Sequence, residues 1–155
     1  MNKINIRKTK KEDLKIISKI YRDEFSKPPY NENWTEKKSI NKMRFFLKFY
    51  DLYSVIFKKQ VIGFACINKN FMCPGEVAFW EEFAIKKEFQ NGGIGTFVLN
   101  EIFKIYKKKG YKKFMGIVNL NSKGIVNLNS KASKLYKKLN ILPSKKNILI
   151  EKNLR

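Results

Sequence analysis

The chain has 155 residues, of which 43% are hydrophobic and 14% aromatic, a composition that fits one folded domain and excludes a disordered chain. It contains no histidine, which excludes a Ser-His-Asp or Cys-His triad and argues against a zinc site, so no metal is expected. No apolar run approaches the roughly 18 residues of a membrane span and no signal-peptide pattern opens the sequence, so we expect a cytoplasmic protein without a membrane partner.

Hydrophobic periodicity and turn residues predict, in chain order, a strand at 3–8, helices at 9–25 and 35–49, strands at 52–59, 61–68 and 76–85, a helix at 94–109, a strand at 112–121, a helix at 131–140 and a strand at 147–154. Thr9 is expected to cap the first helix with Glu12 as its capping-box partner. Lys59 and Gln60 are expected at the turn of a hairpin. The order β-α-α-β-β-β-α-β-α-β indicates an α/β fold with a mixed, mostly antiparallel sheet flanked by helices. No linker interrupts it, so a single domain over 1–155 is expected.

The net charge of +21 is unevenly distributed. Residues 1–82 hold 17 Lys and Arg against 10 Asp and Glu, a net charge of +7, whereas residues 83–155 hold 17 against 3, a net charge of +14. The second part should therefore attract anions, such as a nucleic acid, an acidic protein or a phosphorylated cofactor. Lysine accounts for 30 of the 34 basic residues, so the charge also fits a general role in solubility. Of the two cysteines, Cys66 is expected to be buried and Cys73 to lie at the surface.

The stretch "FAIKKEFQNGGIGTFVLNEI" places a glycine-rich turn between a strand and a strong amphipathic helix. Glycines at such a turn let backbone N–H groups face a ligand, and the helix N-terminus adds a positive dipole end, which together favour a pyrophosphate. No Lys-Ser/Thr pair follows, so this is not a P-loop, and the spacing of a dinucleotide-binding fingerprint is absent.

Gln90-Asn91-Gly92-Gly93-Ile94-Gly95 resembles the Q/R-x-x-G-x-G/A signature of the GCN5-related N-acetyltransferase (GNAT) family. The order of elements is similar to that family from end to end, and "NSKASKLYKKLNI" resembles its N-x-x-A-x-x-x-Y segment. The resemblance implies the GNAT acyl-CoA N-acyltransferase fold and acetyl-CoA (coenzyme A) as cofactor. It places the pyrophosphate on the turn and pantetheine along the preceding strand, with contacts from Phe83, Ala84, Ile85, Gln90, Asn91, Gly92, Gly93, Ile94, Gly95, Thr96 and Asn129.

The family chemistry is direct attack of a primary amine on the thioester, which needs a base to take a proton. Without histidine a carboxylate is the natural choice, and "FWEEFAI" offers two. Strand alternation predicts Glu81 and Glu82 on opposite faces. Glu82 is the first candidate because it lies closest to where the strand meets the acyl group, and Glu81 is the second. A solvated glutamate at a strand edge is the alternative role. The resemblance implies that Tyr136 protonates the leaving thiolate, and packing of the last helix is the alternative role for it.

The acceptor is poorly specified by the sequence. The family places acceptor contacts in the loop "FSKPPYNENW" and the second helix, which makes Tyr30, Glu32 and Trp34 candidates together with Glu81. An aminoglycoside or a polyamine would need a local acidic pocket, which Asp23, Glu24, Glu32, Glu36, Glu81 and Glu82 could supply. A protein amine, or a non-enzymatic module that binds nucleic acid or an acidic protein, would suit the global charge. These alternatives stay open.

An eight-residue segment, "GIVNLNSK", occurs twice in succession at residues 116–131. Removing one copy leaves the family's usual passage from strand to helix, so the repeat is an insertion of even length that preserves which face each side chain takes. The extra copy is expected to form a loop, a longer strand, a hairpin or a contact in a homodimer. A neutral duplication tolerated in a loop is the alternative.

Overall fold

The computed structural model of the protein describes residues 4–117 and 131–142. Contacts within the chain divide it into two compact units, Met1–Ile117 and Val118–Arg155. The expected last strand at 147–154, Asn129 and most of the repeated segment lie outside the described residues. The single-domain organisation therefore stays a prediction.

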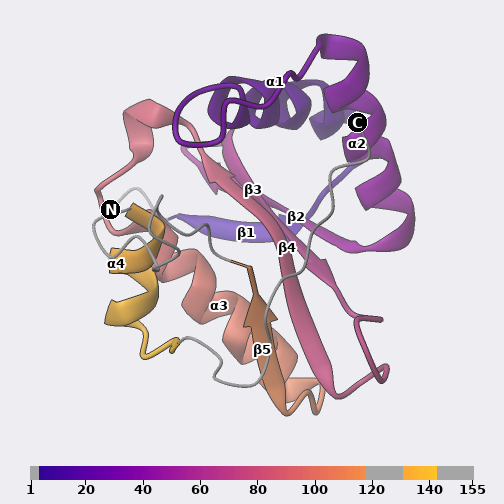
Figure 1. Cartoon of the computed structure of the whole chain (residues 1–155), viewed down its shortest axis with the longest axis vertical. Coiled ribbons are helices and arrows are strands. Elements are labelled where there is room, and N and C mark those ends of the chain that lie inside the picture. Colours follow the sequence, from indigo (N-terminus) through magenta and orange to yellow (C-terminus); the bar gives the residue numbers. More distant parts are fainter. Residues whose placement is uncertain (1–3, 118–130, 143–155) are drawn as a thin grey trace, which may run out of the picture. The chain divides into compact units, whose positions relative to one another are not determined.

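The first unit contains a five-stranded sheet whose strands lie side by side in chain order. They are β1 (Asn5–Lys8), β2 (Asp51–Phe57), β3 (Gln60–Asn68), β4 (Val77–Ile85) and β5 (Lys113–Gly116). The first four strands pair antiparallel and β5 pairs parallel to β4 (Figure 1). The mixed, mostly antiparallel sheet expected from the sequence is thereby confirmed.

Two helices cover one face of this sheet, α1 (Leu14–Phe25) and α2 (Glu36–Phe49). Apolar residues recur along both at helical spacing, so each buries one face against alternate residues of the strands. The resulting core contains Ile17, Ile20, Tyr21 and Phe25 of α1, Met43 and Phe46 of α2, and Leu52, Phe64, Cys66 and Ala84 of the sheet. Cys66 is buried and Cys73 is exposed, as expected, and both are free thiols.

The opposite face of the sheet is covered by α3 (Ile94–Lys108), which follows the short 3-10 helix η2 (Lys87–Phe89). Val98, Leu99, Ile102 and Tyr106 form its buried stripe. Its connection to β5 turns at Gly110, whose φ of 86° favours glycine. The helix therefore runs back along the sheet between two neighbouring parallel strands, which places its N-terminus beside the end of β4 (Figure 1).

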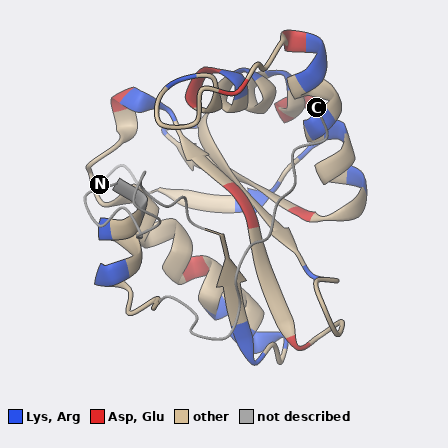
Figure 2. Cartoon of the chain, viewed as in Figure 1, with Lys and Arg blue, Asp and Glu red and all other residues tan. Residues whose placement is uncertain are grey.

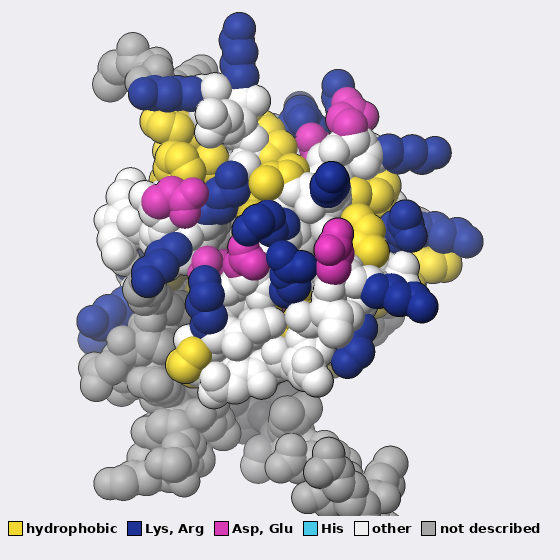
Figure 3. Space-filling model, turned by 90° about the horizontal axis from the view of Figure 1, so that it is seen from above, with side chains coloured by type: hydrophobic (Ala, Val, Ile, Leu, Met, Phe, Trp, Pro, Cys, Tyr) yellow, Lys and Arg dark blue, Asp and Glu magenta, His cyan; other side chains and the backbone are white. Residues whose placement is uncertain are grey.

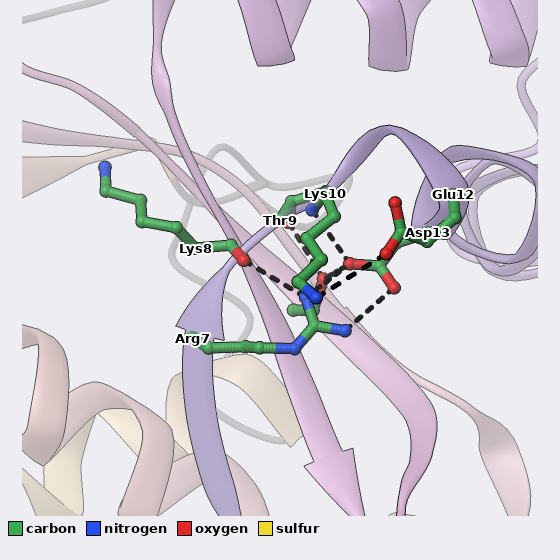
Figure 4. A network of polar contacts seen from close by, with 7 residues as sticks. Arg7, Lys8, Thr9, Lys10, Glu12 and Asp13 are labelled. Carbon is green, nitrogen blue, oxygen red and sulfur yellow. Dashed lines mark hydrogen bonds and ion pairs between the residues drawn. The ribbon is translucent and has the colours of Figure 1, made fainter.

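The N-terminus of the first helix differs from the expectation. A short 3-10 helix, η1 (Lys11–Asp13), precedes α1, and Asp13 Oδ2 accepts a hydrogen bond from the Lys10 amide at 2.9 Å. Thr9 is buried and its hydroxyl is bonded instead to the Ser54 hydroxyl at 2.9 Å. Arg7 donates two hydrogen bonds to the same Asp13 carboxylate, at 2.6 and 3.0 Å (Figure 4). The predicted Thr9–Glu12 capping box is wrong because a buried partner across the sheet takes the Thr9 hydroxyl.

The β2–β3 hairpin turns one residue earlier than predicted. Phe57 pairs with Gln60, so the two turn residues are Lys58 and Lys59, with φ of 46° and 65°. Two consecutive residues with positive φ are typical of a type I′ turn, whose twist matches the flanking strands. The sequence does not indicate the position of this turn because two lysines stand where Asn-Gly is usual.

In the second unit the described helix is α4 (Lys131–Lys138). Asn140 has a φ of 55°, and the Ile141 amide donates to the Tyr136 carbonyl at 3.0 Å, which is a Schellman ending. Within the described residues, no helix is long and apolar enough to cross a membrane.

Candidate active site

Among the described residues, the pairing of β4 with β5 stops before the end of β4. Pairing of β4 with β5 runs from Val77–Lys113 to Trp80–Gly116. Beyond Trp80, Glu82–Ile85 pair with β3, and within residues 4–117 they have no partner on the other side. Alternate backbone N–H and C=O groups of this stretch point toward the side of β5. The pantetheine contacts of Phe83, Ala84 and Ile85 stay predictions.

The glycine turn connects this strand to α3 with two left-handed residues. Asn91 has a φ of 68° and Gly93, the N-cap of α3, a φ of 77°. Asparagine and glycine are the residues that adopt this region most readily. The first hydrogen bond of the helix runs from the Phe97 amide to the Gly93 carbonyl at 3.0 Å. The preceding amides, from Ile94 to Thr96, therefore have no partner within the helix.

Space in front of this turn is open. Asn91, Gly92 and Gly93 are exposed, and a Cβ added to either glycine would meet nothing within 4 Å. A phosphate could therefore approach the backbone closely, where the unpaired amides and the helix dipole favour a negative charge. The turn fits the pyrophosphate of coenzyme A.

The side chain of Gln90 connects the glycine turn to β4 and α1. Its side-chain amide donates to the Ile85 carbonyl at 2.7 Å and to Glu24 Oε2 on α1 at 2.8 Å. These bonds connect the start of the glycine turn to the end of β4 and to α1. A direct contact of Gln90 with the cofactor stays a prediction.

A β-bulge changes the direction of the two glutamates. Cys66 pairs with Glu82 and Ile67 pairs with Trp80, so Glu81 is an extra residue in β4. Glu82 accepts from Tyr21 of α1, and Glu81 accepts from Asn68, two residues beyond the core residue Cys66. Both carboxylates thus lie on the face covered by α1 and α2. Figure 2 shows the acidic stretch of β4 in red. The predicted opposite placement is wrong because the bulge interrupts the alternation.

Glu82 is the carboxylate with the environment of a base. Burial raises its pKa to about 7, while the hydrogen bond from the Tyr21 hydroxyl and the positive charge of Lys42 act in the opposite direction. The negative charges of Glu32 and Glu81 raise it further. A carboxylate with a pKa near the working pH is suited to accept a proton in a reaction.

Three of the four residues predicted to contact the acceptor, Tyr30, Glu32 and Trp34, come from the loop between α1 and α2. The Trp34 indole N–H donates to Glu32, and the Trp34 ring stands edge-on to the Tyr21 ring, with centroids 4.7 Å apart. Tyr30 lies against Phe25 at 4.8 Å, and its pKa is raised by burial and by the charges of Glu82, Glu32 and Glu24. Aromatic faces beside carboxylates favour a bound cation.

The acidic pocket expected from the sequence divides into two groups. Glu82 and Glu32 accept hydrogen bonds from Tyr21 and Trp34. The charge of Glu24 raises the pKa of Tyr30, and that of Glu81 raises the pKa of Glu82. Asp23 instead pairs with Lys19 and Arg22, and Glu36 lies 4.0 Å from Arg22 on the outer surface. Figure 3, which looks onto α1 and α2 from above, shows lysine and arginine side chains around the few acidic ones there. Four carboxylates, and not six, therefore remain for a cationic acceptor.

Tyr136, the predicted acid, and Glu82, the predicted base, belong to different units. Tyr136 lies half-buried in α4, within the second unit, and Asn129 is outside the described residues. Their roles stay predictions. Among residues 4–117 and 131–142, no group of three His, Cys, Asp or Glu could hold a metal ion.

One residue of the site was missed by sequence reasoning. Tyr21 follows Ile17 and Ile20 on the buried stripe of α1, so its spacing is that of a core residue. Only the bulge in β4, which turns Glu82 toward it, makes its hydroxyl part of the site.

Comparison with known proteins agrees with this fold. The fold is similar to a possible acetyltransferase from Clostridium difficile 630, at 16% identity and a TM-score of 0.78 over 98% of this chain and 99% of that chain. It is also similar to the aminoglycoside N-acetyltransferase AAC(6')-Iy in complex with CoA, at 14% identity and a TM-score of 0.73 over 98% and 96%. A third similar structure is the aminoglycoside acetyltransferase meta-AAC0020 from an uncultured soil sample in complex with sisomicin, at 13% identity and a TM-score of 0.70 over 98% and 97%. No curated protein matches the sequence.

The sequence itself matches the family described as "Acetyltransferase (GNAT) family" over residues 14–140. This match begins at the first residue of α1 and extends beyond the end of α4. Because it spans most of the sequence, the chain belongs to the GNAT family and is an acetyl-CoA-dependent N-acetyltransferase.

Proposed function

We propose that the chain acetylates a primary amine of a small cationic molecule, such as an aminoglycoside or a polyamine, in a ternary complex with Glu82 as general base. The observation that carries this proposal is the position of Glu82. It lies on the stretch of β4 beyond the last described pair with β5, next to the acceptor loop, with a pKa of about 7.

The donor side rests on backbone groups. The amides from Asn91 to Thr96 would hold the pyrophosphate, and the backbone of Glu82–Ile85, beyond the last described pair with β5, would hold pantetheine and polarise the thioester carbonyl. Acetyl-CoA supplies an activated acyl group. As the amine nitrogen bonds to the carbonyl carbon and the carbon–sulfur bond breaks, Glu82 takes the proton from nitrogen. Tyr136 would return a proton to the thiolate, a transfer between groups of similar pKa.

The acceptor side favours a small cation over a protein. The net charge of +21 would attract an acidic protein at long range, but salt screens such fields beyond about 8 Å at physiological ionic strength. A small cation close to Glu24, Glu32, Glu81 and Glu82 would experience these local charges, together with the rings of Tyr30 and Trp34. The aminoglycoside acetyltransferases among the similar structures support the same class of acceptor.

The test is an acetyl-transfer assay that measures thiol release from acetyl-CoA with an aminoglycoside, a polyamine and a lysine-containing peptide as acceptors. Glu82→Gln should lower kcat by about 10²- to 10⁴-fold and leave acetyl-CoA affinity nearly unchanged, because the base acts only on the amine. Glu101→Gln is the matched control, since Glu101 is paired with Lys104 on α3. Unchanged turnover in Glu82→Gln would show that Glu82 is not the base.

The choice of acceptor decides the other outcomes. If the lysine-containing peptide is acetylated faster than the small amines, the proposal of a small cationic acceptor is wrong. Salt-dependent binding of RNA without acetyl-CoA binding would overturn the transferase and favour the polyanion-binding alternative.

A further inference from the structure

Glu82 has a single described side-chain donor. The Tyr21 hydroxyl of α1 lies 3.2 Å from Glu82 Oε1, and within residues 4–117 no other side chain is bonded to this carboxylate. The donor and the acceptor come from segments 61 residues apart, joined because α1 packs across the face on which the bulge places Glu82.

The Tyr21 ring is held on three sides. It stacks on Phe25 with centroids 4.6 Å apart, meets the edge of Trp34 at 4.7 Å and lies 6.0 Å from Phe64 of β3. Only 1% of its surface is exposed. A ring packed in this way cannot turn its hydroxyl away from Glu82 without disturbing the core.

The hydroxyl is also fixed as a donor. Burial, with the negative charges of Glu82 and Glu32, raises the pKa of Tyr21 well above its ordinary value. Tyr21 therefore stays protonated over the working range of pH, and a carboxylate beside it can only accept. A hydrogen bond to a carboxylate favours the ionised form, which is the form that a base requires.

The other groups that face Glu82 do not replace this contact. Lys42 of α2 contributes a positive charge, whereas Glu32 of the acceptor loop and Glu81 of the bulge contribute negative charge. Cys66, opposite Glu82 on β3, stays a neutral thiol because burial raises its pKa. Tyr30 of the loop is likewise a neutral phenol at working pH, its pKa raised by burial.

We propose that Tyr21 is a positioning residue for the general base: its hydroxyl holds Glu82 Oε1 and leaves Oε2 free to take the proton of the acceptor amine. This inference rests on the proposed role of Glu82. It also gives the acceptor loop a link to the base, because Trp34 packs against the ring that holds the carboxylate.

The test is Tyr21→Phe, which keeps the ring and its packing and removes only the hydroxyl. A hydrogen bond to a charged group typically contributes an amount that corresponds to about one to two pKa units. Titration of the Glu82 carboxyl, followed by carbon-13 NMR and assigned with Glu82→Gln, should show its pKa rising by this amount. In the acetyl-transfer assay, kcat/KM at pH 6.5 should fall about tenfold or more, and the difference should diminish as the pH rises above 9. The KM for acetyl-CoA should not change.

The matched control is Tyr106→Phe. Tyr106 of α3 donates to the buried Asp51 at 2.6 Å, so this variant removes the same kind of bond far along the sequence from the site. It should reduce stability and leave the pH profile unmoved. If Tyr21→Phe lowers kcat/KM by the same factor at every pH, Tyr21 has only a structural role and the inference is wrong.

The two measurements separate this inference from the proposed function. If the pKa of Glu82 rises in Tyr21→Phe but the pH profile does not move, Tyr21 tunes Glu82 and Glu82 is not the base. If the pKa of Glu82 is unchanged, the positioning role is wrong whatever the assay shows.

Discussion

Gly63 of β3 lies opposite Ile85 at the end of β4, just before the glycine turn. A Cβ at this position would stand 2.4 Å from Ile85 Cδ1 and 2.5 Å from the Ala84 carbonyl oxygen. The second contact is with backbone and cannot be relieved by a rotamer change. We therefore expect Gly63→Ala to lower the free energy of unfolding by about 1–3 kcal/mol, as overpacking of a core does. Urea denaturation followed by circular dichroism checks this value, and an unchanged midpoint would contradict it.

Gly92 gives the matched comparison. Its added Cβ would meet nothing within 4 Å and its φ is not positive, so Gly92→Ala should leave the free energy of unfolding within about 0.5 kcal/mol of its original value. The new methyl group would stand where a phosphate approaches the backbone amides. Weaker binding of acetyl-CoA with unchanged stability would locate the pyrophosphate at this turn, and unchanged binding would place it elsewhere.

At the scale of elements, two buried carboxylates join strands to helices. Asp51, the first residue of β2, accepts from Tyr106 of α3 and pairs with Lys8 of β1 and Lys109. Burial alone would raise its pKa, but the bonds from Lys8 and Tyr106 outweigh burial and hold the pKa well below its ordinary value. In Asp13 the pKa is likewise lowered, because bonds from Arg7, the Lys10 amide and Ser54 outweigh burial.

Acid should therefore weaken these junctions. A depressed pKa means that the folded state binds fewer protons than the unfolded state, so the stabilisation is fully present above the unfolded pKa of about 3.9 and is lost as the pH falls through the folded pKa. We expect the free energy of unfolding to drop steeply below about pH 4. Asp51→Asn should be less stable at pH 7 and show a shallower drop below pH 4, as measured by urea denaturation at a series of pH values. Glu101→Gln, which breaks an exposed pair, should follow the original curve. Parallel curves for Asp51→Asn and the original chain would contradict this account.

The helices and strands could largely be predicted from the sequence, but the long-range hydrogen bonds and the β-bulge that connect them could not. Periodicity identified α3 to within one residue at its C-terminus, because its apolar stripe and the flanking glycines agree. The Thr9 cap was misassigned because Ser54, 45 residues away, takes its hydroxyl. The bulge at Glu81 has no glycine or proline to mark it, and yet it decides which face both glutamates take. The glycine turn could be found from local spacing, whereas the hydrogen bond of Tyr21 to Glu82 joins residues 61 positions apart.

At the scale of the whole molecule, the charge should make folding and cofactor binding respond to salt in opposite ways. With 34 basic and 13 acidic residues the folded chain repels itself, and salt screens this repulsion. We expect the melting temperature to rise between about 10 mM and 150 mM NaCl, where the Debye length falls from about 30 Å to about 8 Å. Over the same range acetyl-CoA, a polyanion, should bind more weakly to a chain whose residues 83–155 carry 17 basic and 3 acidic side chains. A melting temperature that does not rise, or an affinity for acetyl-CoA that does not fall, over this range of salt would contradict this electrostatic account.

The repeated segment allows charge and geometry to be separated. A variant lacking Gly124–Lys131 loses a single lysine and regains the family spacing between strand and helix. Because nearly all of the charge remains, calorimetric titration of acetyl-CoA into both chains should give parallel plots of log affinity against log salt. Binding by both chains would show that the duplication is compatible with a working cofactor site, and an acceptor screen follows. Binding by the shortened chain alone would show that the extra copy disables the site through geometry, since the electrostatic attraction is nearly the same in both.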